Sequence, residues 1–388
     1  MSSLATEDAF LVLNAGSSSI KYAVYNTDLK ILLNGQVDRI GMGPQFHGSG
    51  TDLPVPVAPE ASHAEVLDWL LTHIEELSGP LRIVGAGHRV VHGGQEFAAP
   101  TRITDEVIAK LQALAPLAPG HQPHNLAGIA AVARRWPAIA QVACFDTAFH
   151  RTQPRVSQLF AIPRALSEDG VLRYGFHGLS YHYISTQLPH HLDTPNGKVI
   201  VAHLGNGASM CAMENRQSVA TTMGYTALDG LVMGRRCGEL DPGVIFHLLR
   251  DRGMSVAEIE TMLGTKSGLL GVSDLSSDMR DLLASDSPAA AEAVELFVYQ
   301  ACKKIGALAA TLGGLDAIVF TGGIGENAAP IRARILEGCA WLGADLDPVA
   351  NAAAVSRITT KESRLAAHVI PTDEEGIIAG ETQRLIAR

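Results

Sequence analysis

The chain has 388 residues, of which 47% are hydrophobic and 18% are charged, a balance typical of a globular protein with length for about two domains. Its formal net charge of -10 argues against broad electrostatic attraction to nucleic acid or to an anionic membrane, so we expect neither as a partner. Any phosphate group that the protein binds must therefore be held by local contacts.

Short apolar runs alternate with longer segments of helical periodicity, which indicates an α/β fold. Strands are expected at 10–14, 20–25, 82–93, 140–146, 198–205, 208–213 and 316–323. Helices are expected at 62–77, 104–114, 124–135, 178–188, 242–252, 255–263, 288–312 and 328–342.

The five cysteines are scattered, and none forms a C-x-x-C pair, which predicts reduced thiols rather than a disulfide framework or a zinc site. The first ten residues, MSSLATEDAF, lack the basic and apolar regions of a signal peptide. The apolar segment 303–323 is interrupted by paired glycines and by Asp316 before it could span a bilayer. We therefore expect a cytoplasmic protein without a membrane-spanning segment.

Two segments of the chain read alike. LVLNAGSSSIKYAV (11–24) and VAHLGNGASMCAM (201–213) each contain an apolar strand, a turn of small residues and a second apolar strand, with Ser19 opposite Ser209. This likeness indicates an internal duplication, and two similar lobes would then face each other across a cleft, a common place for a ligand. The alternative is that any two glycine-containing hairpins look alike.

Three glycine-rich segments could bind phosphate, although no Walker motif, G-x-x-x-x-G-K-[ST], occurs. NAGSSSIK (14–21) combines the backbone freedom of Gly16, the hydroxyls of Ser17 and Ser19, and the charge of Lys21. HLGNGAS (203–209) lets a backbone approach an anion closely. FTGGIGENAAPIRARIL (320–336) runs from a strand through a glycine loop into a helix whose N-terminus would point amides at a ligand. Each segment alone could be a tight turn, but three together favour phosphate binding.

Three side chains stand out because their surroundings are apolar. Arg89 in GHRVVHGG has a guanidinium that suits a carboxylate or phosphate, or it forms an internal ion pair with a buried carboxylate. Asp146 ends a strand in FDTAFH, where α/β proteins tend to place catalytic groups, or it caps the next segment. His177 in YGFHG is a functional group or an ordinary core histidine.

Two loops carry further charge. MGRRCGELDPG contains Arg235 and Arg236, which either clamp a phosphate or are merely solvated. PTDEEGIIAGET places Asp373, Glu374 and Glu375 before an apolar helix, where acidic residues suit either the helix dipole or a metal ion.

Taken together, these segments resemble the acetate kinase family of the actin-like ATPase superfamily. The resemblance covers nearly the full chain, from LNAGSSSIKY through GHRVVHGG, FDTAFH, YGFHG, HLGNGAS, MGRRCGELDPG and FTGGIGEN to TDEEGIIAGET. It implies two duplicated ribonuclease-H-like domains with an active-site cleft between them, and a homodimer. The N-terminal domain would be residues 1–148 completed by 372–388, and the nucleotide-binding domain would be residues 149–371.

The resemblance also implies a reaction: reversible transfer of the ATP γ-phosphoryl group to acetate, giving acetyl phosphate and ADP, with Mg²⁺ as the metal ion and Mn²⁺ as its substitute. Asn14 and Glu374 match the metal-site residues, and Arg89 matches the residue that holds the acetate carboxylate. The other active-site matches are Asp146, His177, Arg236 and His121, with Val91 and Phe176 at the pocket for the methyl group. The matches for nucleotide contact are Lys21, His203, Leu204, Gly205, Asn206, Gly207, Asp278, Met279, Arg280, Gly323, Ile324, Gly325, Glu326 and Asn327.

The chemistry of that reaction suits these residue types. A carboxylate is already a nucleophile at neutral pH, so no strong general base is required, and the difficulty lies in bringing it up to an anionic triphosphate. Arginine, histidine and a metal ion neutralise the transferring phosphoryl oxygens, while Arg89 orients the attack. We expect Asp146 to organise the metal or its waters rather than to accept a proton.

Two positions depart from the family pattern. Gly120 stands where members usually carry a bulkier apolar residue, and Ala227 stands where proline is common. Both match positions that line the pocket for the acetate methyl, so propionate should be accepted better than usual, since one methylene is worth about 1 kcal/mol there. Val91 at the same pocket favours the smaller acid, so acetate remains the first choice of substrate.

Two other hypotheses belong to different classes. An actin-like switch protein would use ATP without phosphorylating an acid, but it would have no need for Arg89 or for the set His121, His177 and Arg236. A sugar kinase of the same superfamily would need neutral hydrogen-bonding groups in place of the arginines.

Overall fold

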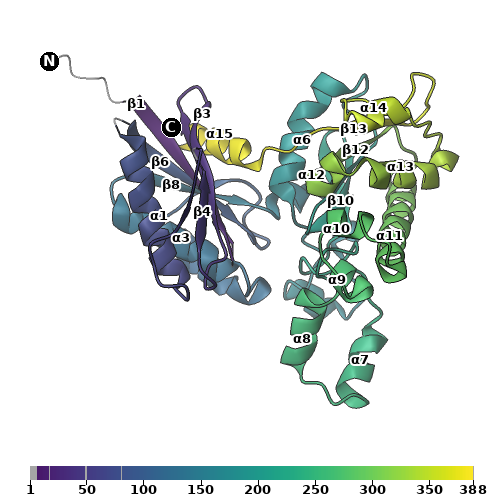
Figure 1. The fold of residues 1–388 in the computed structure, drawn as a ribbon, viewed down its shortest axis with the longest axis horizontal. Coiled ribbons are helices and arrows are strands. Elements are labelled where there is room, and N and C mark those ends of the chain that lie inside the picture. The colour runs from purple at the N-terminus through teal and green to yellow at the C-terminus, as the bar shows by residue number, and fades with distance from the viewer. Residues whose placement is uncertain (1–6, 17, 49, 80, 388) are drawn as a thin grey trace. The chain divides into compact units, whose positions relative to one another are not determined.

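The computed structural model describes residues 7–16, 18–48, 50–79 and 81–387 (Figure 1). The chain divides into two compact units. Unit 1 contains the described residues of Met1–Phe149 and Asp373–Arg388, and unit 2 contains His150–Thr372. Each unit is built on one mixed β-sheet.

The sheet of unit 1 has the strand order β5-β4-β3-β2-β1-β6-β8-β7. Strands β1, β2 and β3 are antiparallel neighbours, whereas β1, β6 and β8 are parallel, so these last three end at the same edge. The bounds are β1 (Glu7–Ala15), β2 (Ile20–Asn26), β3 (Ile31–Asp38), β4 (Gln45–Gly48), β5 (Thr51–Pro54), β6 (Leu81–Val90), β7 (Thr101–Arg102) and β8 (Ala140–Phe145).

Helices cover both faces of this sheet. α1 (His63–Ser78) and α3 (Gln122–Arg135) lie on one face and α15 (Glu374–Ile386) on the other (Figure 1), with α2 (Asp105–Ala113) beside α3. On β6, Gly85 and Gly87 make room for α15: an added Cβ would lie 2.1 Å from Ile386 Cδ1 and 2.2 Å from Thr382 Oγ1 respectively. The close approach of α15 fixes its first residue, Glu374, at the edge where the parallel strands end.

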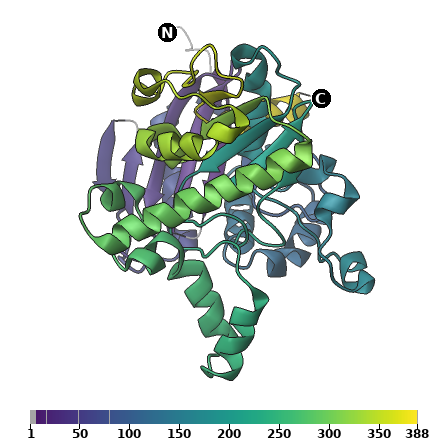
Figure 2. The ribbon, with the colours of Figure 1, turned by 90° about the vertical axis from the view of Figure 1, so that its right-hand side faces the viewer.

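The sheet of unit 2 has the order β11-β10-β9-β12-β13, and the long helix α11 (Pro288–Leu312) crosses it (Figure 2). The strands are β9 (Val199–Leu204), β10 (Ala208–Glu214), β11 (Gln217–Thr221), β12 (Ala317–Thr321) and β13 (Ala366–Val369). The other helices are α4 (Arg155–Gln158), α5 (Arg164–Glu168), α6 (Gly178–His191), α7 (Pro242–Arg250), α8 (Val256–Thr265), α9 (Gly268–Ser273), α10 (Met279–Leu283), α12 (Gly322–Asn327), α13 (Ala329–Gly338) and α14 (Pro348–Ala352). Short 3-10 turns lie at Ala115–Leu117, Ala148–Thr152 and Ala340–Leu342.

The two sheets share one topology. The orders β3-β2-β1-β6-β8 and β11-β10-β9-β12-β13 both join three antiparallel strands to two parallel ones. The predicted duplication is therefore confirmed, since the hairpins β1–β2 and β9–β10 occupy the same place in each sheet. The predicted match of Ser19 with Ser209 is wrong, because Ser19 precedes β2 whereas Ser209 is the second residue of β10 and pairs with His203.

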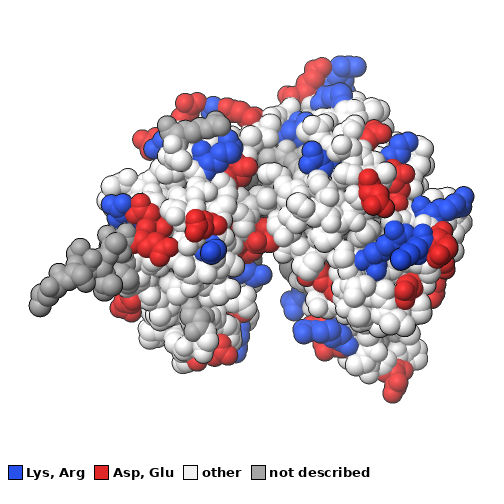
Figure 3. Space-filling model, turned by 90° about the horizontal axis from the view of Figure 1, so that it is seen from above, with Lys and Arg blue, Asp and Glu red and all other residues white. Residues whose placement is uncertain are grey.

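Each predicted strand and helix has a counterpart, with corrections. β6 ends at Val90 rather than at residue 93, and β12 ends at Thr321 rather than at residue 323. The helix predicted at 328–342 is α13, which ends at Gly338 and is followed by the 3-10 turn Ala340–Leu342. Residues 322–327 are not a loop but form the short helix α12 directly after β12. No helix in the described part of the chain is both long and apolar enough to cross a membrane. On the face drawn in Figure 3, Lys and Arg are interspersed with Asp and Glu.

Candidate active site

Four polar side chains of unit 1 meet where its parallel strands end. Arg89, near the end of β6, donates from Nε and Nη2 to the two carboxylate oxygens of Asp146 at 3.1 and 2.5 Å. Its Nη1 donates to Asn14 Oδ1 on β1 at 3.2 Å, and its Nε lies 3.9 Å from Glu374 Oε2. The sequence predicted all four as site residues, and the fold brings them together around one guanidinium.

The pairing of Arg89 with Asp146 resolves two alternatives. Asp146 is 1% exposed, follows β8 directly, and gives both of its carboxylate oxygens to Arg89 rather than to a helix cap. Arg89 therefore does form an internal ion pair. Bidentate pairing fixes the plane of the guanidinium.

The charges of this cluster do not balance. Burial raises the pKa of Glu374 to about 7; Arg89 opposes this shift, and the Asp146 carboxylate adds to it. Burial also raises the pKa of Asp146, against the opposing effect of Arg89. Two carboxylates share one guanidinium in a buried place, which disfavours the ionised form of the second.

The donor atoms of this cluster suit a divalent cation. Asn14, Asp146 and Glu374 offer only oxygen, the donor that Mg²⁺ prefers. A cation there would favour the ionised form of Glu374, whose pKa is raised chiefly by burial and further by the Asp146 carboxylate. Among the described residues, no group of three or more His, Cys, Asp or Glu side chains is arranged to hold a metal ion.

Two buried amides at the start of α3 hold the backbone beside Arg89. Asn125, 2% exposed, accepts from Val91 N at 3.0 Å and donates to Ala15 O at 2.8 Å. Gln122 accepts from His92 N at 3.2 Å and donates to His92 O at 3.1 Å. Sequence reasoning missed both residues, although two amides three positions apart at a helix start are a detectable signal.

The remaining predicted residues around this edge differ in exposure. Val91 is buried, whereas His121 is exposed and immediately precedes α3. Gly120 is also exposed, and a Cβ added there would meet nothing within 4 Å. Ser17, predicted to support the phosphate end of the site, lies outside the described residues, and Ser19 is half-buried.

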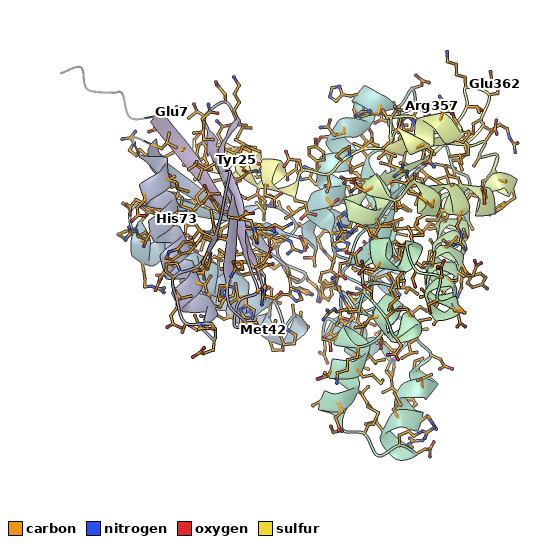
Figure 4. All side chains as sticks on the ribbon, in the orientation of Figure 1. Glu7, Tyr25, Met42, His73, Arg357 and Glu362 are labelled. Carbon is orange, nitrogen blue, oxygen red and sulfur yellow. The ribbon has the colours of Figure 1, made fainter. Side chains whose placement is uncertain are left out.

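Lys21 lies on β2 opposite Asn14 and is exposed. It lines a pocket of about 380 Å³ together with Tyr25, Asp373 and Glu375. Tyr25 faces the α15 side of the sheet, and His73 on α1 marks the other side (Figure 4). The pKa of Tyr25 is raised by burial and by the carboxylates of Asp373 and Glu375.

In unit 2, His177 and Arg236 converge on the turn between β9 and β10. A Cβ added to Gly207 would lie 3.0 Å from Arg236 Nη2 and 3.2 Å from His177 Nε2, so both side chains rest against this glycine. Arg236 Nη1 also donates to Ala227 O at 2.7 Å. Two nitrogen donors that meet over a glycine turn form a suitable place for an anion.

His177 is held in a strained conformation by buried hydroxyls. Its φ of 57° and ψ of 25° lie in the left-handed region, which costs free energy for a residue other than glycine. Its Nδ1 lies 2.8 Å from Ser209 Oγ, which lies 2.5 Å from the hydroxyl of Tyr181. The ring of His177 stacks on His203 with centroids 4.3 Å apart, and His203 Nδ1 lies 2.8 Å from Ser180 Oγ.

His150 anchors the backbone just before His177. Its Nε2 donates to Phe176 O at 2.9 Å, and its Nδ1 lies 2.9 Å from Ser218 Oγ. Burial lowers the pKa of His150 to about 4, so the ring stays neutral at neutral pH. Sequence reasoning missed His150, Ser209 and Tyr181 as site residues, because their contacts join segments far apart in the chain.

The predicted nucleotide segments of unit 2 surround the ends of β9 and β12. A Cβ on Gly322 would lie 2.9 Å from Leu204 O. Gly234 N donates to Asn206 O at 3.0 Å, and a Cβ on Gly234 would lie 1.9 Å from Asn206 Oδ1. The turn at 205–207 therefore packs against both α12 and the loop that carries Arg236.

Several of the residues predicted to contact the nucleotide have side chains that are buried or already hydrogen-bonded within the protein. Leu204 and Met279 are buried, so they would contact a nucleotide only through their backbones. The carboxylate of Glu326 accepts from Gly322 N at 2.8 Å and from Thr372 N at 3.2 Å. Its role is therefore structural, because it links these two backbone segments. Gly325 is also buried.

The other residues predicted to contact the nucleotide are more accessible to solvent. Asp278 caps α10 and pairs at 2.6 Å with the side chain of Arg280, which is 89% exposed. Asn327 and Gly323 are exposed and are joined by a 2.9 Å hydrogen bond from Asn327 Nδ2 to Gly323 O. Ile324 is half-buried, and Arg235 is exposed beside Arg236.

Two sheets that share the order of a five-strand core, each with polar residues at the ends of its parallel strands, define an actin-like ATPase fold. The model of the acetokinase family matches residues 9–380. The acetate kinase of Rhodopseudomonas palustris (strain TIE-1) is 52% identical, covering 97% of this chain and 98% of its own length, and that of Rhizobium meliloti is 47% identical, covering 98% and 99%. The chain belongs to the acetokinase family.

Solved structures agree with this assignment. A propionate kinase from Francisella tularensis subsp. tularensis SCHU S4 superposes with a TM-score of 0.92 at 38% identity, covering 97% of this chain and 99% of that one. Porphyromonas gingivalis acetate kinase superposes with a TM-score of 0.88 at 36% identity, covering 98% of this chain and 100% of its own.

Proposed function

We propose that the protein is an acetate kinase, which reversibly transfers the γ-phosphoryl group of ATP to acetate and gives acetyl phosphate and ADP. The geometry of Arg89 carries this proposal. A guanidinium has five N–H donors, and within the described residues three of those of Arg89 serve Asp146 and Asn14. One N–H remains on each Nη, in the plane that Asp146 fixes, and the two suit the carboxylate of a small acid.

In this mechanism acetate reacts as the carboxylate, so no side chain has to remove a proton. Arg89 holds the acetate carboxylate and orients one of its oxygens to attack the γ-phosphorus in line, while Val91 and Phe176 provide apolar surface for the methyl group. Arg236 and His177 donate to the equatorial oxygens as charge develops on them in the transition state, and His121 assists them. Asp146 orients Arg89 and organises the water around the metal site.

Asn14 and Glu374 would hold Mg²⁺, and the same oxygen donors would accept Mn²⁺. The bound metal supplies neutralising charge to the phosphates of ATP. The raised pKa of Glu374 supports this assignment, because a carboxylate that burial disfavours, with Asp146 beside it, would be stabilised by a bound cation.

Nucleotide binding is proposed for 203–207, 278–280 and 323–327, with Lys21 attracting the phosphates. The backbone amides of the glycine turn at 205–207 and of the start of α12 supply donors for phosphate oxygens. The two functional domains would be residues 1–148 with 372–388, and residues 149–371.

A homodimer is proposed on the evidence of α7. Figure 2 shows α7 and α8 projecting as a helical hairpin, and no residue of α7 is buried within the described chain. Its apolar residues include Val244, 39% exposed, and Phe246, 52% exposed. A second copy of the chain would cover this surface.

The five cysteines are unpaired, which suits a reducing cytoplasm.

Propionate is the second candidate substrate. Gly120 matches a position that lines the methyl pocket in the family, and the absence of a side chain there favours an acid that is one methylene longer. A solved relative that superposes over almost the full chain is a propionate kinase, which supports this candidate.

A hydroxamate assay tests the proposal. Purified protein would be incubated with ATP, Mg²⁺ and hydroxylamine plus acetate, propionate or butyrate, and Arg89→Ala protein prepared in the same way would control for contaminating kinases. We expect acyl hydroxamate from acetate. ATP hydrolysis without acyl phosphate from any acid would contradict the proposal and point to a nucleotide switch, and a preference for acetate above about 200-fold would exclude propionate.

A further inference from the structure

The fold brings together two of the five scattered cysteines. Cys302 lies on α11, Cys339 follows α13 directly, and the two thiols are close enough for each to shift the pKa of the other. Cys302 Sγ also donates at 3.6 Å to Ile335 O, which accepts from Cys339 N at 3.1 Å. A Cβ added to Gly338 would lie 2.5 Å from Cys302 Sγ, so this thiol packs against the residue before Cys339.

The two thiols have different environments. Cys302 is partly exposed, and its pKa is lowered because the Cys339 thiol donates a hydrogen bond to it. Cys339 is 1% exposed, and its pKa is raised by the same hydrogen bond and by burial. An accessible thiol that ionises first next to a buried partner is the arrangement of a reactive cysteine and its resolving cysteine.

The other three cysteines lack such a partner. Cys144 and Cys211 are fully buried in strands, and burial raises the pKa of Cys211 to about 12. Cys237 is half-buried, its pKa is raised by burial, and its Sγ lies 3.2 Å from Gly238 O. Among the five, only Cys302 has its pKa lowered.

We propose that Cys302 and Cys339 form an oxidisable dithiol site that reacts with hydroperoxides. The Cys302 thiolate attacks the outer peroxide oxygen, the O–O bond breaks, and the leaving alkoxide or hydroxide takes up a proton. The sulfenic acid on Cys302 is then attacked by Cys339, which loses its proton as the S–S bond forms and water leaves. Two thiols are oxidised to one disulfide, the peroxide is reduced, and a thiol reductant restores the pair.

The buried partner should protect Cys302 from irreversible oxidation. When the resolving thiol is present, the sulfenic acid is consumed before a second peroxide converts it to sulfinic acid. Reactivity of the pair does not depend on which acid the enzyme phosphorylates.

The test uses the full-length protein under native conditions. After treatment with hydrogen peroxide and alkylation of the remaining thiols, mass spectrometry of a digest should find a peptide linking Cys302 to Cys339 within one chain. Dithiothreitol should restore all five free thiols. In Cys339→Ser protein, Cys302 should instead accumulate as sulfenic and then sulfinic acid, whereas Cys211→Ser, a matched buried control, should leave the linked peptide unchanged.

Two outcomes would overturn the inference: oxidation of Cys302 in the unaltered chain without a linked peptide, or a disulfide that joins two chains. Phenylarsine oxide, which bridges adjacent thiols, provides a second measurement on the unaltered chain without an oxidant. We expect the treated protein, once unfolded, to show two fewer titratable thiols than the untreated protein, and an unchanged number of thiols would show that the pair is too far apart.

Discussion

Replacing Glu374 with glutamine should stabilise the fold while it abolishes activity. The Glu374 side chain is 19% exposed, lies 3.9 Å from Arg89, and shares that guanidinium with Asp146. Burial is the largest cause that raises its pKa from 4.5 to about 7. At about 1.4 kcal/mol for each pKa unit, this difference of about 2.5 corresponds to about 3 kcal/mol by which folding disfavours the ionised carboxylate.

The sign of the effect depends on pH. Between about pH 4.5 and 7 the folded protein keeps a proton that the unfolded chain releases, so the free energy of unfolding contributed by Glu374 falls as the pH rises. The full penalty is present above about pH 7 and is absent below the unfolded pKa. Glutamine cannot ionise, so Glu374→Gln should gain about 3 kcal/mol over the unaltered protein at pH 8 but only about 1 kcal/mol at pH 5.

Urea unfolding in metal-free buffer, followed by circular dichroism at both pH values, measures this difference. Formation of acyl phosphate by the variant should fall by orders of magnitude, because the proposed metal site loses its carboxylate. Glu375→Gln is the matched control: it removes a charge from the same helix N-terminus and should lose a few tenths of a kcal/mol. Equal stability of Glu374→Gln and the unaltered protein at pH 8, or a gain that is as large at pH 5, would refute the reasoning.

Four further substitutions test other parts of the proposal. Arg236→Ala should lower turnover by about 10²-fold or more with little change in the KM for ATP, because its contact strengthens in the transition state; near-normal turnover would remove it from that role. Ser209→Ala should lower turnover, since His177 loses the hydroxyl that holds its ring at Nδ1, and Ser209→Thr should restore turnover; unchanged turnover in the alanine variant would contradict this. Gly120→Leu should raise the kcat/KM ratio of acetate to propionate about tenfold, and a constant ratio would show that Gly120 does not line the pocket. Phe246→Asp should convert a dimer to a monomer in light scattering, whereas a dimer that persists would place the interface elsewhere.

Local sequence signals were sufficient to predict the helices and strands that begin or end at a clear boundary. Helices α1 and α8 begin after Ser62 and Ser255, and each has a complete capping box with a glutamate three residues on. The hairpins β1–β2 and β9–β10 were predicted because apolar runs flank a turn of small residues. These features are local, so they can be read from the sequence.

Elements that depend on distant contacts were not predicted. Strand β3 has a mixed polar sequence and only one buried residue, and β13 has four residues, so neither shows a strong alternating pattern. The segment 322–327 is rich in glycine, yet it is helical because Arg332, 1% exposed, donates to the carbonyls of Gly325 and Glu326 at 3.0 and 2.8 Å. The position of that arginine depends on how α13 packs.

The charged residues of the site could be named from motifs, but their partners could not. Arg89 and Asp146 are 57 positions apart in the chain, and they meet only because β6 and β8 are parallel neighbours. Tyr181 and Ser209 meet because α6 packs beside β9, next to β10. Sheet order therefore decides which side chain orients which, and it is a property of the fold rather than of a local segment.

The sequence left two alternatives for Arg89, an internal ion pair or anion binding. In the structure these two roles are compatible. A buried guanidinium without a partner would cost several kcal/mol, so Asp146 is needed for the arginine to lie at this edge at all. Because Asp146 binds through Nε and Nη2 and Asn14 accepts from Nη1, one donor remains on each Nη, and the ion pair fixes the direction in which both point. The ion pair thus prepares the guanidinium for a second carboxylate, and this gives Asp146 a role in positioning that does not require it to accept a proton.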